Sequence, residues 1–193
     1  MSRALVAIVV LLGLIGTPRQ SAAQNEDQTC DRLPRNVQIY EMFRSTVQLL
    51  IEQSQTLQRQ CRIIAAAVHV RIVIQTRSPE AGPARARATI ARHEAGALRA
   101  TIVLPISQEM PELLAHELEH VIEQIEGVDL AALARRDSSQ ATRDHQGTFE
   151  TARATRAGQA AAAEIETRQA ELAIARRETR AANALKASLR KPQ

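Results

Sequence analysis

The chain has 193 residues, of which 25 are basic and 21 acidic, a formal net charge of +4, and only 2% aromatic residues. This charge is too nearly balanced for a protein that binds nucleic acid through its phosphates, and the chain offers too few aromatic rings to stack on bases. Composition therefore argues against nucleic acid as a partner.

The first 23 residues have the pattern of a signal peptide. Arg3 supplies a positive charge, residues 4–16 form an apolar run, and Ser21-Ala22-Ala23 places small residues at the cleavage position. The apolar run is shorter than the about 20 residues needed to cross a bilayer. We therefore predict cleavage after Ala23 and no stable membrane anchor afterwards. The mature chain, residues 24–193, would be a single domain that is periplasmic or secreted.

Both cysteines follow the predicted cleavage position and would enter an oxidising space, which favours a disulfide between Cys30 and Cys61. A straight helix over 37–61 would span roughly 36 Å. The link from Cys30 to Val37 reaches only about 25 Å. The bridge thus requires a shorter or broken helix, and the sequence leaves the bridge and two free thiols open as alternatives.

An amphipathic helix is predicted over 37–64, because its apolar residues recur every three or four positions. The stripe consists of Val37, Tyr40, Phe43, Val47, Leu50, Ser54, Leu57, Cys61 and Ile64, in which Ser54 is the one polar member. The stripe is typical of a helix facing a core, and a coiled-coil seam is the alternative. The β-branched run 68–74 predicts a strand, and the Pro- and Gly-containing segment 77–84 a loop. Residues 85–106 then predict a β-hairpin that turns at Glu94-Ala95-Gly96.

The second half of the chain is predicted to be mainly helical. Ser107 and Pro111 mark the start of a helix whose apolar pattern continues to Ile125, and Gly127 would end it. Residues 129–147 are predicted to be irregular. A long helix rich in Ala, Arg and Glu is predicted from near Thr148 towards residue 188. Because it has few apolar residues with helical spacing, we expect its end to fray beyond about residue 175. The sum is an α+β fold: a small, mostly antiparallel sheet of about three strands packed on an N-terminal helix, the helix after Ser107 and the long C-terminal helix.

The motif that carries chemistry is His116-Glu117-Leu118-Glu119-His120. Two histidines four residues apart on a helix project from one face and can bind one tetrahedral ion. Glu117 is rotated by about 100° from His116, where its carboxylate can reach a water on that ion. The ion lowers the pKa of the water towards 7, and the carboxylate accepts its proton during attack on a carbonyl. By contrast, His69 and His93 lie in predicted strands and are interpreted as ordinary surface or core residues.

A strand pair followed by a helix with H-E-x-x-H resembles the zincin metallopeptidases, over roughly residues 97–150. The resemblance implies bound Zn²⁺, a peptide or protein substrate, and Glu117 as the catalytic residue. It also implies an edge strand that holds an extended peptide, for which Leu98–Ile106 is the corresponding segment. Glu119 departs from the uncharged residues that are usual between the two histidines. The metzincin extension is absent, because Glu123 and Glu126 occupy its Gly and His positions.

The third metal ligand is not part of the motif. The gluzincin branch of the family takes it from a glutamate on a later helix, and Glu150 is similar in position, although the asparagine that usually precedes this glutamate is missing. Glu123 is a rival, but on a straight helix it lies about 10 Å along the axis from His116. It is better interpreted as a hydrogen-bond acceptor that supports a histidine. His145 and Glu164 remain as further alternatives.

The motif, together with this resemblance, implies two alternative functions. The first is an exported zinc metallopeptidase of the gluzincin type, with His116, His120 and Glu150 as metal ligands. The alternative is a catalytically inactive metal-binding or scaffold protein with the same fold. A di-iron helical bundle would need a second E-x-x-H sequence, and neither His69, His93 nor His145 has a glutamate three residues before it.

Overall fold

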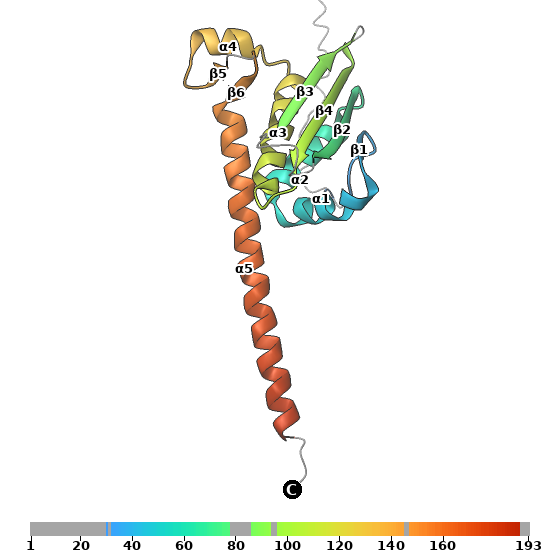
Figure 1. Ribbon diagram of the computed structural model, residues 1–193, viewed down its shortest axis with the longest axis vertical. Coiled ribbons are helices and arrows are strands. Elements are labelled where there is room, and N and C mark those ends of the chain that lie inside the picture. The colour runs from blue at the N-terminus through green and yellow to red at the C-terminus, as the bar shows by residue number, and fades with distance from the viewer. Residues whose placement is uncertain (1–29, 31, 78–85, 94–95, 145–146, 190–193) are drawn as a thin grey trace, which may run out of the picture.

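The computed structural model describes residues 30, 32–77, 86–93, 96–144 and 147–189. The elements in chain order are β1 (Val37–Ile39), α1 (Glu41–Gln53), α2 (Gln55–Ala66), β2 (Val70–Arg77), β3 (Arg87–Arg92), β4 (Leu98–Pro105), α3 (Met110–Ile125), α4 (Leu130–Arg136), β5 (Ala141–Arg143), β6 (Phe149–Thr151) and α5 (Ala152–Leu189), as Figure 1 shows. The predicted signal peptide and most of the predicted loop 77–84 lie outside these residues. No helix within the described ranges combines the length and the apolar character needed to cross a membrane.

The fold is α+β, as predicted, but its sheet is mixed rather than mostly antiparallel. Four strands lie in the order β1-β2-β4-β3, and a separate two-stranded sheet joins β5 to β6. The predicted hairpin is confirmed, because β3 pairs antiparallel with β4. Two parallel pairings make the sheet mixed. Residues Val37–Ile39 share the apolar period of the following helix but form a strand that pairs parallel with β2. On its other side, β2 pairs parallel with β4.

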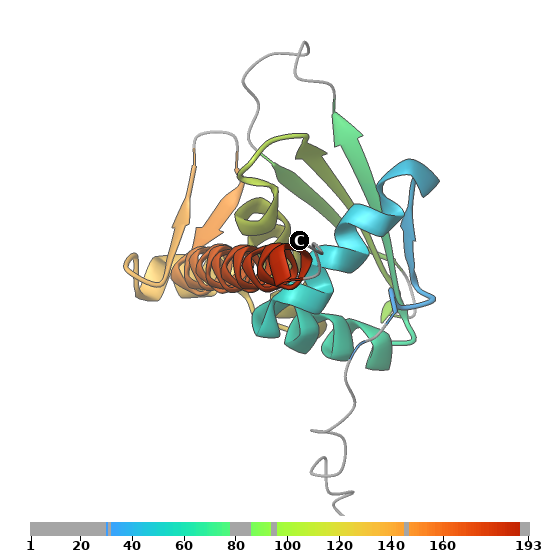
Figure 2. The same ribbon diagram turned by 90° about the horizontal axis from the view of Figure 1, so that it is seen from below.

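One face of the sheet forms the core. Alternate residues of β2 and β4 point inward and are buried, as a strand period of two requires; they are Val70, Ile72, Ile74, Leu98, Ala100, Ile102 and Leu104. Helices α1, α2 and α3 lie on this side of the sheet, and α5 packs on the far side of α3 (Figure 2). Helix α3 is therefore enclosed between the sheet and α5, and ten of its residues are buried.

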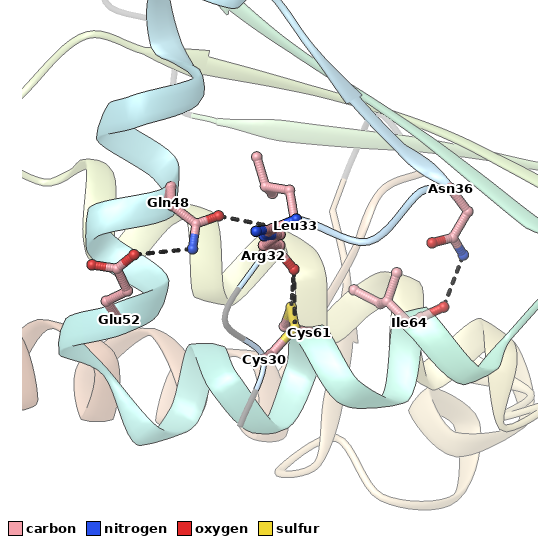
Figure 3. The surroundings of a disulfide bond; sticks show 8 residues. All are labelled: Cys30, Arg32, Leu33, Asn36, Gln48, Glu52, Cys61 and Ile64. Carbon is pink, nitrogen blue, oxygen red and sulfur yellow. Dashed lines mark hydrogen bonds between the residues drawn. A yellow bond between two sulfur atoms is a disulfide. The ribbon is translucent and has the colours of Figure 1, made fainter. Parts of the chain in front are cut away.

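The predicted helix over 37–64 is broken at Ser54, whose backbone is extended (φ −130°, ψ 122°). The Ser54 hydroxyl accepts a hydrogen bond from the amide of Leu57 (3.1 Å) and so caps the start of α2. The predicted condition for the disulfide is met by this break and by the strand that precedes α1. Cys30 and Cys61 are bonded, with 6.1 Å between their Cα atoms (Figure 3).

The disulfide joins the start of the described chain to α2, and neighbouring polar contacts hold the same segment. The amide of Leu33 donates to the side chain of Gln48 (3.0 Å), and Asn36 donates to the carbonyl of Ile64 (2.8 Å), as Figure 3 shows. A bridge across 31 residues removes roughly 4 kcal/mol of conformational freedom from the unfolded chain. The segment that leads into β1 is thereby fixed against the helical layer.

The chain after α3 is more ordered than predicted. Gly127 (φ 74°) ends α3 in the left-handed conformation that favours glycine, as expected. Residues 129–147, predicted to be irregular, contain α4 and β5. Helix α5 begins at Ala152, slightly later than predicted, because Phe149–Thr151 pairs with β5. It runs for 38 residues, about 57 Å, and its second half projects beyond the rest of the molecule (Figure 1).

Candidate metal centre

His116 and His120 lie on the same face of α3, one helical turn apart. Their Nε2 atoms are 3.2 Å apart. The side chain of His120 is 10% exposed and that of His116 18%, so both rings are largely enclosed and the His116 side is the more open. The spacing of four residues thus gives the convergent pair of nitrogens that the motif predicts.

Glu150 is brought to this pair from β6, the short strand immediately before α5. Its Oε2 lies 3.0 Å from Nε2 of His116, and its side chain is 53% exposed. The three donor atoms of His116, His120 and Glu150 lie within 4.8 Å of one another. Ligands of one tetrahedral zinc ion, each about 2.05 Å from the metal, are separated by about 3.3 Å. The group therefore offers two imidazole nitrogens and one carboxylate oxygen that could bind one metal ion, and Glu150 lies on its more exposed side.

The protonation of His116 depends on its acidic neighbours. Burial of the ring lowers the pKa of His116, but the hydrogen bond with Glu150 and the charges of Glu150, Glu117 and Glu123 outweigh this effect and raise the pKa above 6.5. An ion at the site would take the place of this proton.

Glu117 is buried beside the two histidines. Burial raises the pKa of its carboxyl group, and the positive charges of His120 and His116 oppose this shift only in part. A hydrogen bond from the backbone of Ala88 in β3 also reaches the carboxylate. A buried glutamate next to a group of metal donors has the position of a proton acceptor for a metal-bound water.

The strand beside the centre differs from the one predicted. Leu98–Ile106 was expected to provide the edge strand, but β4 is paired on both sides, with β2 and with β3. The edge strand is β3, because β4 is inserted between β2 and β3 in the strand order. Ala88, whose backbone reaches Glu117, lies on β3. The outer strand of the described sheet and the candidate base are therefore adjacent.

The other predicted ligand candidates lie elsewhere. Glu123 is buried, and its Oε2 lies 3.0 Å from Nδ1 of His120, the nitrogen that faces away from His116. This is the supporting contact that was predicted for it. Glu164 binds the start of α2, where it accepts hydrogen bonds from Ser54 (2.6 Å) and from the amide of Thr56 (3.0 Å), so it is wrong as a ligand candidate. His145 is outside the described residues.

The charged residue between the two histidines also has a structural explanation. The side chain of Glu119 is 1% exposed and is not among the grouped metal donors. It accepts hydrogen bonds from Arg59 and Gln60 of α2 and from Arg153 of α5, each at 2.6 Å. Arg153 in turn pairs with Glu126, and the hydrogen bond with Glu126 and the contact with Glu119 raise the pKa of its guanidinium. The motif helix is thus tied by charge to both of its neighbouring helices.

Small residues let α5 approach α3 closely enough to deliver Glu150. Ala154, Ala157, Gly158 and Ala161 are buried along one side of α5. A Cβ atom added to Gly158 would lie 2.8 Å from the carbonyl oxygen of Glu112 and 3.4 Å from Cβ of His116. The first of these distances is shorter than real Cβ contacts allow, and the partner is backbone. Gly158 is therefore required by the close packing of the two helices at the metal donors.

We expect Gly158→Ala to lower the free energy of unfolding by about 1–3 kcal/mol, the usual effect of overpacking. The sign is informative, because replacing glycine by alanine inside an exposed helix usually stabilises it by about 1 kcal/mol. Chemical denaturation with urea measures the change, and Gln159→Ala, at an exposed neighbouring position of α5, is the matched control. Equal or greater stability of Gly158→Ala would contradict the close contact.

The structure brings together the predicted donors His116, His120 and Glu150 and places Glu117 and Glu123 beside them. Two further residues around the centre were not predicted. Thr151 donates a hydrogen bond to Glu123 (2.8 Å), and Arg153 binds Glu119. Neither residue belongs to the motif. Their only sequence signal is their closeness to Glu150, together with the helix-capping tendency of threonine. Comparison with models of known protein families, with curated proteins and with solved structures found no significant match.

Proposed function

We propose that this chain is an exported, zinc-dependent metallopeptidase of the gluzincin type, which hydrolyses peptide bonds with a metal-activated water. One observation carries the proposal: the donor atoms of His116, His120 and Glu150 lie within 4.8 Å of one another, beside the buried carboxyl group of Glu117. Bound zinc would supply a water of lowered pKa and polarise a carbonyl. The chain itself would supply the three ligands and the proton acceptor.

Each residue has a separate task in this proposal. The two imidazoles and the Glu150 carboxylate would bind the ion through their facing atoms. Glu117 would take a proton from the water and pass it to the leaving amine, for which its position beside the two histidines suits it. An extended peptide would add as a further strand beside β3, the outer strand of the described sheet next to Glu117.

The disulfide supports the proposed export. Disulfides form and persist in the periplasm and outside the cell, and they are rare in reducing compartments. The bond between Cys30 and Cys61 therefore agrees with a periplasmic or secreted protein. The proposed partner of the exported protein is a peptide or protein substrate.

A second candidate is a metal-binding protein without turnover. The observation that favours it is the hydrogen bond between Glu117 and the backbone of Ala88, which engages the candidate base with the edge strand. This bond occupies one of about four acceptor sites of the carboxylate. It also lowers the pKa of Glu117, which makes the group a weaker proton acceptor. The two candidates share the metal centre and differ only in the role of Glu117.

Metal content tests the feature that both candidates share. We expect the purified wild-type chain to carry about one zinc ion per chain, the stoichiometry of a single three-ligand site. His116→Ala should lose most of this zinc, because one of the three ligands is removed. Elemental mass spectrometry gives the stoichiometry. His93→Ala, which removes an exposed histidine from outside the group, should retain the zinc. Equal zinc in both variants, or none in the wild type, would overturn the proposed centre.

A further inference from the structure

The residue between Glu150 and α5 has a hydroxyl group that serves two parts of the chain. Thr151 is 2% exposed. Its Oγ1 accepts a hydrogen bond from the amide of Ala154 (3.0 Å), as the cap of a helix does. The same hydroxyl donates to Oε1 of Glu123 (2.8 Å). Thr151 therefore joins the first turn of α5 to a carboxylate of α3.

Glu123 continues the connection to the metal donors. Its second oxygen, Oε2, lies 3.0 Å from Nδ1 of His120. Carboxylate oxygens are hydrogen-bond acceptors, so this contact favours the tautomer of His120 that has its proton on Nδ1. The other nitrogen, Nε2, then has a free lone pair and faces Nε2 of His116 at 3.2 Å. Glu123 thus selects the form of His120 that can bind an ion at the centre.

We propose that Thr151 is a positioning residue: through Glu123 it fixes the tautomer and orientation of His120, and so links the docking of α5 on α3 to metal binding. The effect on metal binding rests on the proposed zinc centre. The three contacts that lead from Ala154 through Thr151 and Glu123 to His120 are present without a metal. Glu150 precedes Thr151 directly, so the same backbone segment brings both the ligand and the hydroxyl to α3. Docking of α5 and binding of the ion then favour each other, as any two linked equilibria must.

Zinc affinity of the full chain, measured by competition with a chromophoric chelator, is the first test. Thr151→Val keeps the shape of the side chain without the hydroxyl, and we expect its affinity to fall about 10- to 100-fold, as for other residues that orient a ligand. Thr151→Ser should restore most of the affinity. Thr155→Val is the matched control, because Thr155 lies in the same turn and its hydroxyl bonds only to the backbone carbonyl of Thr151. It should bind zinc as the wild type does.

A double-mutant cycle separates positioning from capping. Glu123→Gln leaves the bond between Thr151 and Ala154 in place and removes the charged acceptor of His120. If Thr151 acts through Glu123, the double variant should lose about as much affinity as Glu123→Gln alone, since effects within one chain of contacts are not additive. Additive losses, or a Thr151→Val variant that melts earlier but has wild-type zinc affinity, would overturn the proposal and leave Thr151 as a helix cap only.

The tautomer of His120 gives a measurement that needs no metal. In the metal-free wild type and in Thr151→Ser, nitrogen–proton correlation spectra of the imidazoles should show a proton on Nδ1 of His120. In Thr151→Val this preference should weaken. If the wild type binds no zinc but the Nδ1 preference still weakens in Thr151→Val, the proposed function is overturned and the role of Thr151 is supported. An unchanged tautomer in Thr151→Val would overturn that role, whatever the zinc content.

Discussion

Glu117→Gln is expected to lower the rate of peptide hydrolysis by about 10²- to 10⁴-fold, the usual contribution of a positioned acid–base group. The amide has nearly the shape of the carboxylate but cannot accept the proton of the water. Because Glu117 is not among the three grouped donors, the zinc content should stay at the wild-type level. The rate is measured with a fluorescein-labelled unfolded protein as a general substrate, and the zinc content by elemental mass spectrometry.

Glu109→Gln is the matched control, since Glu109 is an exposed carboxylate at the start of the same helix. It should leave both rate and zinc content unchanged. A Glu117→Gln variant as active as the wild type would show that any hydrolysis proceeds without this carboxylate. A wild type that binds zinc but cleaves no substrate would instead favour the second candidate, metal binding without turnover.

Glu119→Ala is expected to lower the free energy of unfolding by about 1.5–3 kcal/mol, the usual contribution of hydrogen bonds to a charged group, because the two arginine partners are partly exposed and can turn to water. Glu119 is the buried acceptor of three donors that come from α2 and α5. Its removal leaves Arg59 and Arg153 without this acceptor, and Gln60 loses one of its two contacts. Urea denaturation followed by circular dichroism measures the loss.

Glu126→Ala provides a control that shares a partner with Glu119. It also removes a carboxylate bound to Arg153, but the Glu126 side chain is 41% exposed. An exposed ion pair contributes about 1 kcal/mol or less, because water and salt screen it. The loss should therefore be smaller than for Glu119→Ala. Equal losses in the two variants would contradict the inference that the buried carboxylate of Glu119 stabilises the packing of α3 more than the exposed carboxylate of Glu126 does.

The part of the site that could be predicted is the part whose geometry is local. Four residues on a helix always separate His116 from His120 by about one turn, so their convergence follows from the sequence. The same arithmetic assigned Glu123 to the support of a histidine. Glu150 was found only through a resemblance to known metallopeptidases, because its approach to α3 depends on the packing of α5. The partners of Glu119 could not be predicted, since they come from two other helices.

The errors in the fold have the same physical origin. The apolar period of 37–64 continues through Ser54, so nothing local marks the break. The break is supported by Glu164, 110 residues away in the chain, which binds the Ser54 hydroxyl. Similarly, Val37–Ile39 has the spacing of a helix stripe, but it becomes a strand because β2 offers it a parallel partner. Local patterns predicted where most elements lie, and contacts between distant segments decided how they pair.

The projecting half of α5 determines which method is suitable for measuring the oligomeric state. Beyond residue 165 the described side chains of this helix are exposed, apart from the partly buried Leu172. A rod attached to a rounded body meets more hydrodynamic drag than a sphere of equal mass. We therefore expect the single chain to elute from a sizing column earlier than a compact protein of equal mass, so its apparent mass there would be too high. Light scattering, which reports mass independently of shape, is the suitable way to count the subunits.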